Sequence, residues 1–357
     1  MLKLSLRPAL PLVLLLSLAC SPDRPTAPAG INADQGVSFC CGGGPPPVWT
    51  ATKLTLPTGT WTGAGAKGVN DTGVVVGYVQ VANYKYRPVR WTNGVPNFLV
   101  VTTQNHWALP QAINNNGDIV GQVQWISGNL STPVQPVRWV MPGGLMQTLP
   151  NLGYDGWAMD VNNSGVAVGI SRATSAGQQH AVKWSSSGTI TDLHPLGATK
   201  SLAQGINDFG EIVGIAKFGT AVHGWKWKTD NSQLDLGLVW NESVAEIDGN
   251  SEAVATVQYQ GISQAVMFTP NGTIIGLGAG SGSIATSIGE SRRIVGVNGA
   301  IPWTTRFDTP VNMPLPSGAG YAFPEDLNRC GMVVGSAAGG TLTSQVAVKW
   351  TKSGCDP

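Results

Sequence analysis

The chain has few charged residues. Asp, Glu, Lys and Arg make up 11% of its 357 residues, against about 25% in a typical soluble domain. The 21 basic and 20 acidic residues leave a formal net charge of +1. Domains that bind nucleic acid or lie on an anionic membrane surface usually carry a strong basic excess. The composition therefore excludes an electrostatic footprint of that kind, and we expect no nucleic-acid partner.

Long apolar runs are also missing. The apolar stretch Leu10–Leu18 has nine residues, whereas a membrane-spanning helix needs about 20. Lys3 and Arg7 precede this stretch, and small residues lead from it to Cys20. This pattern is typical of a bacterial lipoprotein signal peptide over residues 1–20, with lipidation at Cys20; an ordinary signal peptide is the alternative. We expect an exported protein, at the outer membrane or the cell surface, that meets the membrane only through this anchor.

Residues that form turns are abundant. The chain contains 47 Gly and 24 Pro, which predicts many short strands joined by turns. Residues 21–47 are rich in Pro and Gly and show no hydrophobic period. We interpret them as a tether between the anchor and a domain over residues 48–357.

A short β-type pattern recurs seven times. Two strand-like segments flank an Asn-x-x-Gly turn, as in Val69–Gly77 and Ile113–Gly121, and two copies, Ile247–Ala255 and Ile288–Gly296, are degenerate. Asn side chains and Gly backbones suit tight hairpin turns. The equivalent turn positions, 39 to 48 residues apart, are Asn70, Asn114, Asn162, Asn207, Asp248, Gly289 and Asn328.

A second motif ends each copy in an aromatic residue. These residues are Trp91, Trp139, Trp184, Trp227, Phe268, Trp303 and Trp350. Their regular spacing predicts packing between repeats, where each buries a large apolar area. A Lys or Arg precedes five of them, and we expect these cations on a solvated face: Arg90, Arg138, Lys183, Lys226 and Lys349.

Each copy thus offers four short strands, and seven such units predict an all-β, seven-bladed β-propeller. A solenoid is the alternative, but it needs distinct capping repeats. The last copy ends after its third strand at Trp350, while the strand-like segment Val48–Pro57 precedes the first copy. We therefore predict that the N-terminal strand pairs with the last blade and closes the ring, leaving no open sheet edge there.

The repeat resembles a known family. Gly205–Gly214 (GINDFGEIVG), His180–Trp184 (HAVKW) and the Asp-Leu pair that follows are similar to the bacterial HAF-type extracellular repeat. The resemblance covers about residues 64–350. It implies an exported, surface-associated protein and brings no catalytic residues with it.

Four cysteines remain if Cys20 is lipidated: Cys40, Cys41, Cys330 and Cys355. An even number in an exported protein favours two disulfides. Their positions in the repeat predict that Cys40 and Cys41 pair with Cys330 and Cys355, in either order, and latch the ring closure. A zinc site is the competing interpretation.

No catalytic constellation emerges from the sequence. The Gly-x-Gly-x-x-Gly match at Gly63–Gly68 precedes a β-hairpin, whereas a dinucleotide site needs a helix there. A Gly-x-Ser-x-Gly elbow and a calcium loop are absent, and the carboxylates look scattered. His180 and His223 share one repeat position and are expected to be structural. We predict no catalytic residue, no cofactor and no metal.

A second aromatic set precedes the turn positions, in the connections that enter each repeat: Trp61, Trp107, Trp157, Trp240 and Tyr321, with His106 beside Trp107. Such connections ring one mouth of a propeller, where aromatic rings can stack on sugars or grip peptide side chains. Filling gaps between blades is the alternative. We expect a non-enzymatic binding module for a glycan or a protein; the alternatives are a lyase or hydrolase with its site in the central channel, or a structural component of the cell envelope.

Overall fold

The computed structural model describes residues 48–81, 85–101, 106–127, 130–141, 143–240, 242–306 and 309–353. These residues form strands, and none of their segments is a helix long and apolar enough to cross a membrane. The signal peptide, the tether and three of the cysteines (Cys40, Cys41 and Cys355) lie outside the described residues. Lipidation and the disulfide latch therefore stay predictions.

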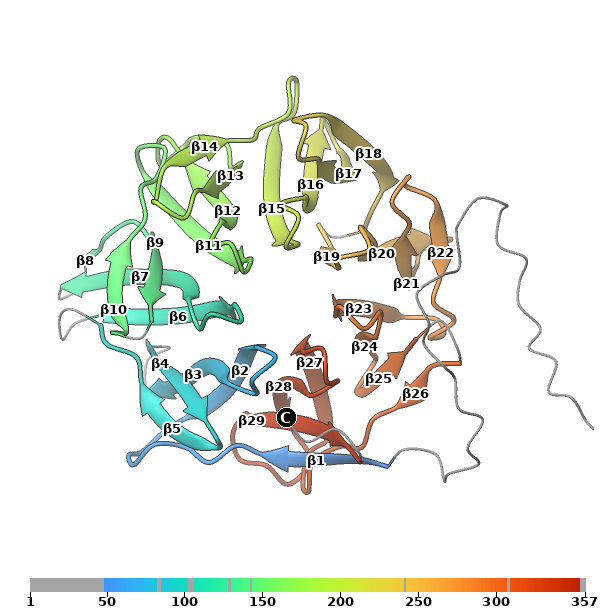
Figure 1. Cartoon of the computed structure of the whole chain (residues 1–357). Coiled ribbons are helices and arrows are strands. Elements are labelled where there is room, and N and C mark those ends of the chain that lie inside the picture. Colours follow the sequence, from blue (N-terminus) through green and yellow to red (C-terminus); the bar gives the residue numbers. More distant parts are fainter. Residues whose placement is uncertain are drawn as a thin grey trace, which may run out of the picture. The chain divides into compact units, whose positions relative to one another are not determined.

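Seven antiparallel sheets stand around a common centre (Figure 1), and in six of them the main strands follow chain order from the centre outward. Blade 1 consists of β2 (Gly63–Val69), β3 (Val75–Val81), β4 (Lys85–Thr92) and β5 (Val95–Phe98). Blade 2 consists of β6 (His106–Ile113), β7 (Ile119–Ser127), β9 (Gln135–Val140) and β10 (Leu145–Thr148), with β8 (Leu130–Ser131) beside β7. Blade 3 consists of β11 (Asp155–Val161), β12 (Ala167–Arg172), β13 (His180–Trp184) and β14 (Ile190–Asp192).

The remaining blades repeat this plan. Blade 4 consists of β15 (Lys200–Ile206), β16 (Ile212–Phe218), β17 (Ala221–Trp227) and β18 (Gln233–Leu238). The two degenerate copies also form blades: blade 5 has β19 (Val244–Ile247), β20 (Ala253–Tyr259), β21 (Ile262–Phe268) and β22 (Ile274–Gly276), and blade 6 has β23 (Ser283–Ile288), β24 (Ile294–Asn298), β25 (Ile301–Thr305) and β26 (Val311–Asn312). The seven-bladed β-propeller expected from the repeats is thus confirmed.

Blade 7 is made from both ends of the described chain. It contains β27 (Tyr321–Leu327), β28 (Val333–Ala338) and β29 (Val346–Lys352), and its outermost strand is β1 (Trp49–Lys53). β1 runs antiparallel to β29, with Ala51 opposite Trp350. The predicted closure by the N-terminal strand is therefore confirmed.

The turn after each innermost strand makes hydrogen bonds within its own blade and to the next blade. In blade 3 the Asn162 side-chain oxygen accepts a hydrogen bond from the Val166 amide at 3.0 Å, and Gly165 takes the left-handed conformation (φ +74°). The Asn162 amide nitrogen donates to the Asn207 carbonyl of blade 4 at 3.1 Å. Asn70, Asn114, Asn207 and Asn328 make the same two kinds of contact.

The Gly that ends the repeat pattern has a steric cause. A Cβ on Gly214 would lie 1.9 Å from the carbonyl oxygen of Leu202 on the innermost strand. Five other blades have Gly at this place, and blade 5 has Ala255. There the innermost strand β19 is reduced to four residues and pairs with β20 only from Val244 onward. Ala thus replaces the Gly of the repeat pattern in the blade whose innermost strand is shortest.

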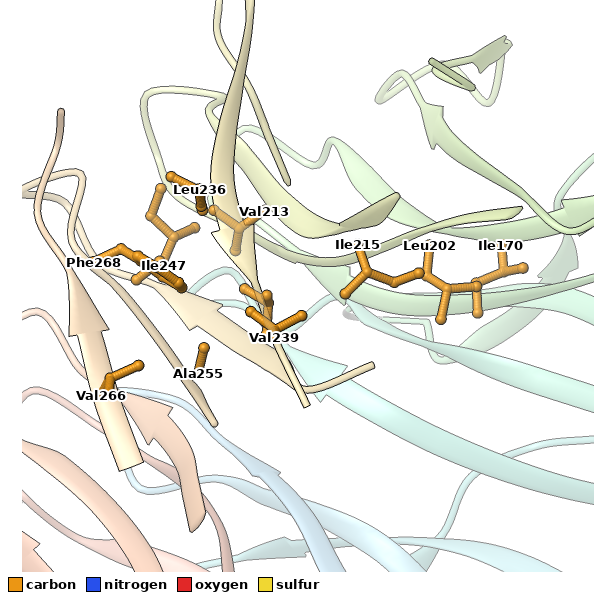
Figure 2. Close-up of a cluster of buried hydrophobic side chains, with 12 residues drawn as sticks. Ile170, Leu202, Val213, Ile215, Leu236, Val239, Ile247, Ala255, Val266 and Phe268 are labelled. Carbon is orange, nitrogen blue, oxygen red and sulfur yellow. The ribbon is translucent and has the colours of Figure 1, made fainter. Parts of the chain in front are cut away.

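The repeat-equivalent aromatic residues are buried, as expected. Trp91, Trp139, Trp184, Trp227, Phe268, Trp303 and Trp350 are at most 4% exposed. The aliphatic core lies between neighbouring blades, and Figure 2 shows one such cluster, which runs from Ile170 of blade 3 through Leu202 and Ile215 of blade 4 to Val266 and Phe268 of blade 5. Interblade packing therefore holds the ring together.

The expectation that the cations before these aromatics are solvated is wrong for two of the five. Arg138 is 8% exposed and Lys226 is 2% exposed. Each forms an ion pair with an acid of its own blade, Asp118 and Glu211 respectively. Burial is possible because the charge is neutralised there, and sequence spacing alone does not reveal that partner.

Candidate functional site

Every innermost strand contains one extra residue at the same repeat position. The pairing with the second strand shifts there by one residue, which is a β-bulge. The bulged residues are Lys67, Gln111, Met159, Gln204, Ala245, Thr286 and Glu325. All seven line one cavity of about 380 Å³. Because the turn residues after these strands line it too, the cavity lies at the turn end of the central channel.

The residue after the bulge is an acid in alternate blades. Asp160, Glu246 and Asp326 occupy this position in blades 3, 5 and 7 and line the same cavity. The blade that follows each acid has a small residue there, and a Cβ on Gly205 would lie only 3.0 Å from the Cα of Glu246. The inner strands therefore approach closely at this level, and acids alternate with small residues around the ring.

Backbone amides fix two of these carboxylates. Asp160 accepts hydrogen bonds from its neighbour Val161 at 2.7 Å and from Ile206 of blade 4 at 2.8 Å. Asp326 accepts the equivalent bonds from Leu327 at 2.7 Å and from Val69 of blade 1 at 2.8 Å. Each carboxylate thus joins two blades and holds a fixed orientation at the cavity wall.

The third acid contacts the second through a hydroxyl group. Ser287 Oγ lies 2.8 Å from Glu246 Oε2 and 3.3 Å from Asp326 Oδ1. A hydroxyl group has one proton, so it donates to only one of the two carboxyl groups. The second contact is attractive only when the other carboxyl group carries a proton. Ser287 therefore links Glu246 of blade 5 to Asp326 of blade 7.

The pKa values of all three acids agree with that geometry. Burial raises the pKa of Asp326 to about 7 and the pKa of Asp160 to about 6. Burial, and then the charges of Asp326 and Asp160, raise the pKa of Glu246 well above its ordinary value. Protonated and ionised carboxyl groups therefore coexist in the cavity near neutral pH.

An ion pair supplies positive charge beside these acids. Lys67 Nζ lies 2.8 Å from Glu325 Oε1, and both residues are bulged side chains of adjacent blades. Burial lowers the pKa of Lys67, but Glu325 outweighs that effect and leaves it raised. Lys67 thus remains positively charged throughout the physiological pH range. Arg329 lines the cavity as well, with Nε 3.8 Å from Asp71 Oδ2.

The rim of the cavity is a chain of amides and carboxylates. The Asn115 side-chain amide donates to Asp71 at 2.8 Å, and the Asn163 amide donates to Asp208 at 2.6 Å. The backbone amide of Arg329 also donates to Asp71, at 2.8 Å. These bonds cross from blade to blade, so the rim is ordered by the same turns that shape the repeat.

Within the described part of the chain, no group of three or more His, Cys, Asp or Glu side chains could hold a metal ion. The three channel acids do not form such a group. Their lone pairs are instead partly taken by backbone amides and by Ser287. The arrangement is therefore suited to hydrogen bonding with a polar ligand and to proton exchange.

The aromatic residues predicted to bind ligand do not line this cavity. Trp107, Trp157 and Tyr321 lie in the innermost strands β6, β11 and β27, not in the connections as expected, because these strands begin earlier than the repeat pattern indicates. Trp61 and Trp240 lie just before strands. All five lie toward the strand starts, opposite the turns. The side chain of His106 lies outside the described residues.

Several of these aromatics already have neighbours in the protein. Trp61 packs edge-on against Phe98 at 5.7 Å between ring centroids, and its indole donates to the Pro57 carbonyl at 2.8 Å. Trp107 donates to Gln124 at 2.6 Å. Tyr321, 41% exposed, is the most open of the set. Their binding role stays a prediction.

The two repeat-equivalent histidines make the same kind of contact in their blades, and their structural role stays a prediction. His180 Nδ1 lies 2.8 Å from Asp192, and His223 Nδ1 lies 2.9 Å from Asp235, in each case within one blade. Cys330 lies in the turn between β27 and β28.

Sequence reasoning missed the channel acids, although a signal for them exists. Asp160, Glu246 and Asp326 each stand two residues before a turn position, namely Asn162, Asp248 and Asn328. When the repeats are aligned on their turns, these three carboxylates occupy one position, although they look scattered along the chain. The bulge that turns them toward the cavity leaves no mark in the hydrophobic pattern.

No protein-family model matches the chain, and no curated protein matches its sequence. Solved structures resemble it in fold. Virginiamycin B lyase from Staphylococcus aureus is 12% identical with a TM-score of 0.55, and the match covers 85% of this chain and 98% of that one. A streptogramin B lyase is 13% identical with a TM-score of 0.52, over 85% and 98%. The β-propeller domain of the Trilobed protease from Pyrococcus furiosus is 9% identical with a TM-score of 0.54, over 84% and 99%. At such identities the likeness concerns the β-propeller fold alone.

Proposed function

We propose that the protein is a non-enzymatic binding module whose ligand, the end of a glycan chain, occupies the central cavity. The observation that supports this most is the convergence of seven bulged side chains, one from each blade, on one cavity of about 380 Å³. That volume lies within the range of about 300–1,000 Å³ that is usual for ligand sites.

The chemistry of the lining favours a ligand rich in hydroxyl groups. Amide, hydroxyl and carboxyl groups can donate to and accept from sugar hydroxyls. Gln204 lines the cavity and is half-buried, and its side-chain amide can both donate to and accept from a sugar hydroxyl.

The predicted location at the cell surface fits a glycan-binding role. A lipid anchor at Cys20, the tether over residues 21–47 and the resemblance to HAF-type repeats together favour a protein held at the outer membrane or cell surface, where glycans are available.

A glycan array probed with the mature protein tests the proposal. Gln204→Ala is expected to weaken binding to the best glycan at least tenfold, because it removes an acceptor inside the cavity. Gln258→Ala, at an exposed position in blade 5, is the matched control and is expected to leave binding unchanged. Equal effects of the two substitutions would contradict the proposal.

A second candidate is a lyase or hydrolase that uses the same cavity. The supporting observation is that burial raises the pKa of Asp160 to about 6 and the pKa of Asp326 to about 7, and groups that titrate near neutrality suit acid–base catalysis. Incubation with bound oligosaccharides and mass analysis of products would decide. This candidate requires turnover that Asp326→Asn abolishes, whereas the binding proposal expects intact glycans.

A further inference from the structure

In two blades, the cation before the buried aromatic residue is itself buried and bridges to the next blade. In blade 2, Arg138 Nη1 donates to the carbonyl oxygens of Gly165 at 3.1 Å and Ser186 at 3.2 Å, both in blade 3. Asp118, in the same blade as Arg138, neutralises its charge. One side chain thus fills the groove between blades 2 and 3.

Blade 4 also has a buried cation that contacts the next blade. Lys226 Nζ donates to Ser251 Oγ of blade 5 at 2.6 Å and lies 3.0 Å from Glu211. Asp118 and Glu211 occupy one repeat position, four residues after Asn114 and Asn207. The cation and this acid therefore form a matched pair.

Blade 3 has the cation without the acid, as do blades 1 and 7. Lys183 stands where Arg138 and Lys226 stand, but the matching position is Val166, and in blades 1 and 7 it is Val74 and Met332. Among the described residues, the Lys183 ammonium group has neither a hydrogen bond nor an ion pair. The groove between blades 3 and 4 remains open instead, as a cavity of about 210 Å³ that Lys183 lines.

Two residues that line this groove correspond to the residues that Arg138 contacts in blade 3. Gly210 and Thr229 line it, at the repeat positions of Gly165 and Ser186. A second cation, Lys228, lines it as well. A lysine without a matched acid beside an open cavity favours an anionic ligand, and Lys228 adds positive charge at the same groove.

We propose that this groove is a second binding site, which takes the carboxylate of an acidic monosaccharide such as a uronic acid. The carboxylate binds Lys183 in the place that Asp118 fills for Arg138. The site is separate from the central cavity and does not depend on its ligand.

The other lining groups explain why a sugar is favoured over a bare anion. The side chains of Thr191, Asn231 and Gln233 line the groove, are exposed and offer hydroxyl or amide groups to sugar hydroxyls. Asp192 also lines it and can accept from a hydroxyl, while its Oδ2 contacts His180 at 2.8 Å. A volume of about 210 Å³ lies below the range of about 300–1,000 Å³ usual for larger ligands, so one sugar residue is the fitting size.

The groove contains one histidine whose nitrogens are already engaged. His194 Nδ1 lies 2.7 Å from Ser201 Oγ, and Nε2 lies 3.0 Å from the Ala198 carbonyl. Its imidazole therefore offers no free nitrogen to a ligand. Selection for a carboxylate falls to Lys183 and Lys228.

Calorimetric titration of the mature protein with glucuronate, at constant ionic strength, tests the proposal. Glucose serves as the neutral analogue and a glutamate-containing dipeptide as a carboxylate without a sugar ring. We expect one glucuronate site, with glucose and the dipeptide at least tenfold weaker. Equal binding of glucose, or of the dipeptide, would overturn the assignment to an acidic sugar, and no detectable glucuronate binding would overturn the site itself.

Two substitutions locate the site. Lys183→Met keeps the aliphatic stem and removes the charge, and Val166→Asp supplies the acid that blade 3 lacks, so each is expected to weaken glucuronate binding at least tenfold. Lys349→Met, at the same repeat position in blade 7, is the control and should stay within twofold of the unmodified protein. Thermal unfolding of each variant confirms that it is folded. Full affinity in both groove variants, or an equal loss in the control, would contradict the location.

Discussion

The indole of Trp91 in blade 1 donates a hydrogen bond to the carbonyl oxygen of Thr55, 2.6 Å away, just after the closing strand β1. Trp139, Trp184, Trp227 and Trp350 make the same contact with the chain that follows the outer strand of the preceding blade. The junction closed by β1 therefore has the same bond as junctions formed by consecutive blades. The N-terminal strand is an integral part of the ring.

Removal of that strand is expected to destabilise the whole ring. A chain that begins at residue 58 loses the partner of β29 and the acceptor of the Trp91 indole. Several backbone hydrogen bonds at about 0.5–1.5 kcal/mol each predict a loss of about 3 kcal/mol or more in the free energy of unfolding. A chain that begins at residue 47 is the control. Coincident denaturation curves of the two chains would contradict an integral role for β1.

The interblade indole bond predicts a difference between two tryptophans at the same repeat position. Trp184 donates to the Pro150 carbonyl at 2.7 Å, whereas the indole nitrogen of Trp303 is buried and has no hydrogen-bond partner among the described residues. Trp184→Phe removes this hydrogen bond, which contributes about 0.5–1.5 kcal/mol. Trp303→Phe removes a donor that has no acceptor and is expected to cost less. Chemical denaturation of both variants measures the difference, and an equal cost would show that the bond adds no stability.

Because Lys226 is paired with an acid and Lys183 is not, we expect their substitution to lower the free energy of unfolding by different amounts. Lys226→Met leaves the half-buried Glu211 without its cation, and loss of a hydrogen bond to a charged group costs about 1.5–3 kcal/mol. Lys183→Met leaves no acid behind and is expected to change the free energy of unfolding by less than about 1 kcal/mol. Urea denaturation of both variants checks this. A similar loss in both would mean that Lys183 has an undetected partner.

The channel acids predict that the protein is more stable under mildly acidic than under alkaline conditions. Burial raises the pKa of Asp326 to about 7, whereas the unfolded chain has the ordinary aspartate value of about 3.9. Between these values the folded protein binds more protons than the unfolded one, so stability falls as pH rises. The contribution is complete below about pH 4 and is lost as pH rises through about 7.

Melting temperatures measured from pH 4.5 to 8.5 test this dependence. Asp326→Asn keeps a neutral side chain at every pH and should flatten the curve. Asp230→Asn is a suitable control, since Asp230 is a surface carboxylate remote from the cavity whose pKa is lowered by hydrogen bonds from Ser232. If the melting temperature of the Asp326 variant fell with pH as steeply as that of the unmodified protein, Asp326 would not be the source of the pH dependence.

Most of the fold could be predicted from the sequence because each repeat encodes its own hairpins. Asn162 and Gly165 determine the turn in blade 3, and the same residues recur in most copies. Trp184 could be assigned to the core because its position repeats with the turn. The closure by β1 followed from counting strands at the two ends of the chain. Even blade 5, with Ala255 in place of Gly, retained enough of the pattern.

The candidate site could not be predicted in the same way. The β-bulge at Met159 changes which side chains enter the channel, and nothing in the local pattern of apolar residues marks it. The shifts in the pKa values of Asp160 and Asp326 arise from burial at the centre of the ring, which depends on all seven blades. The bond from Lys226 to Ser251 likewise appears only when blades 4 and 5 are assembled.

Hydrogen–deuterium exchange of the mature protein, with and without its best-binding glycan, tests most directly the proposal that the central cavity is the binding site. We predict slower exchange in the segments around the bulges and turns of several blades, namely residues 67–71, 159–163 and 204–208, which line that cavity. Protection confined to the outer strands, or to the strand starts around Trp107 and Trp157 with none at the turns, would contradict it.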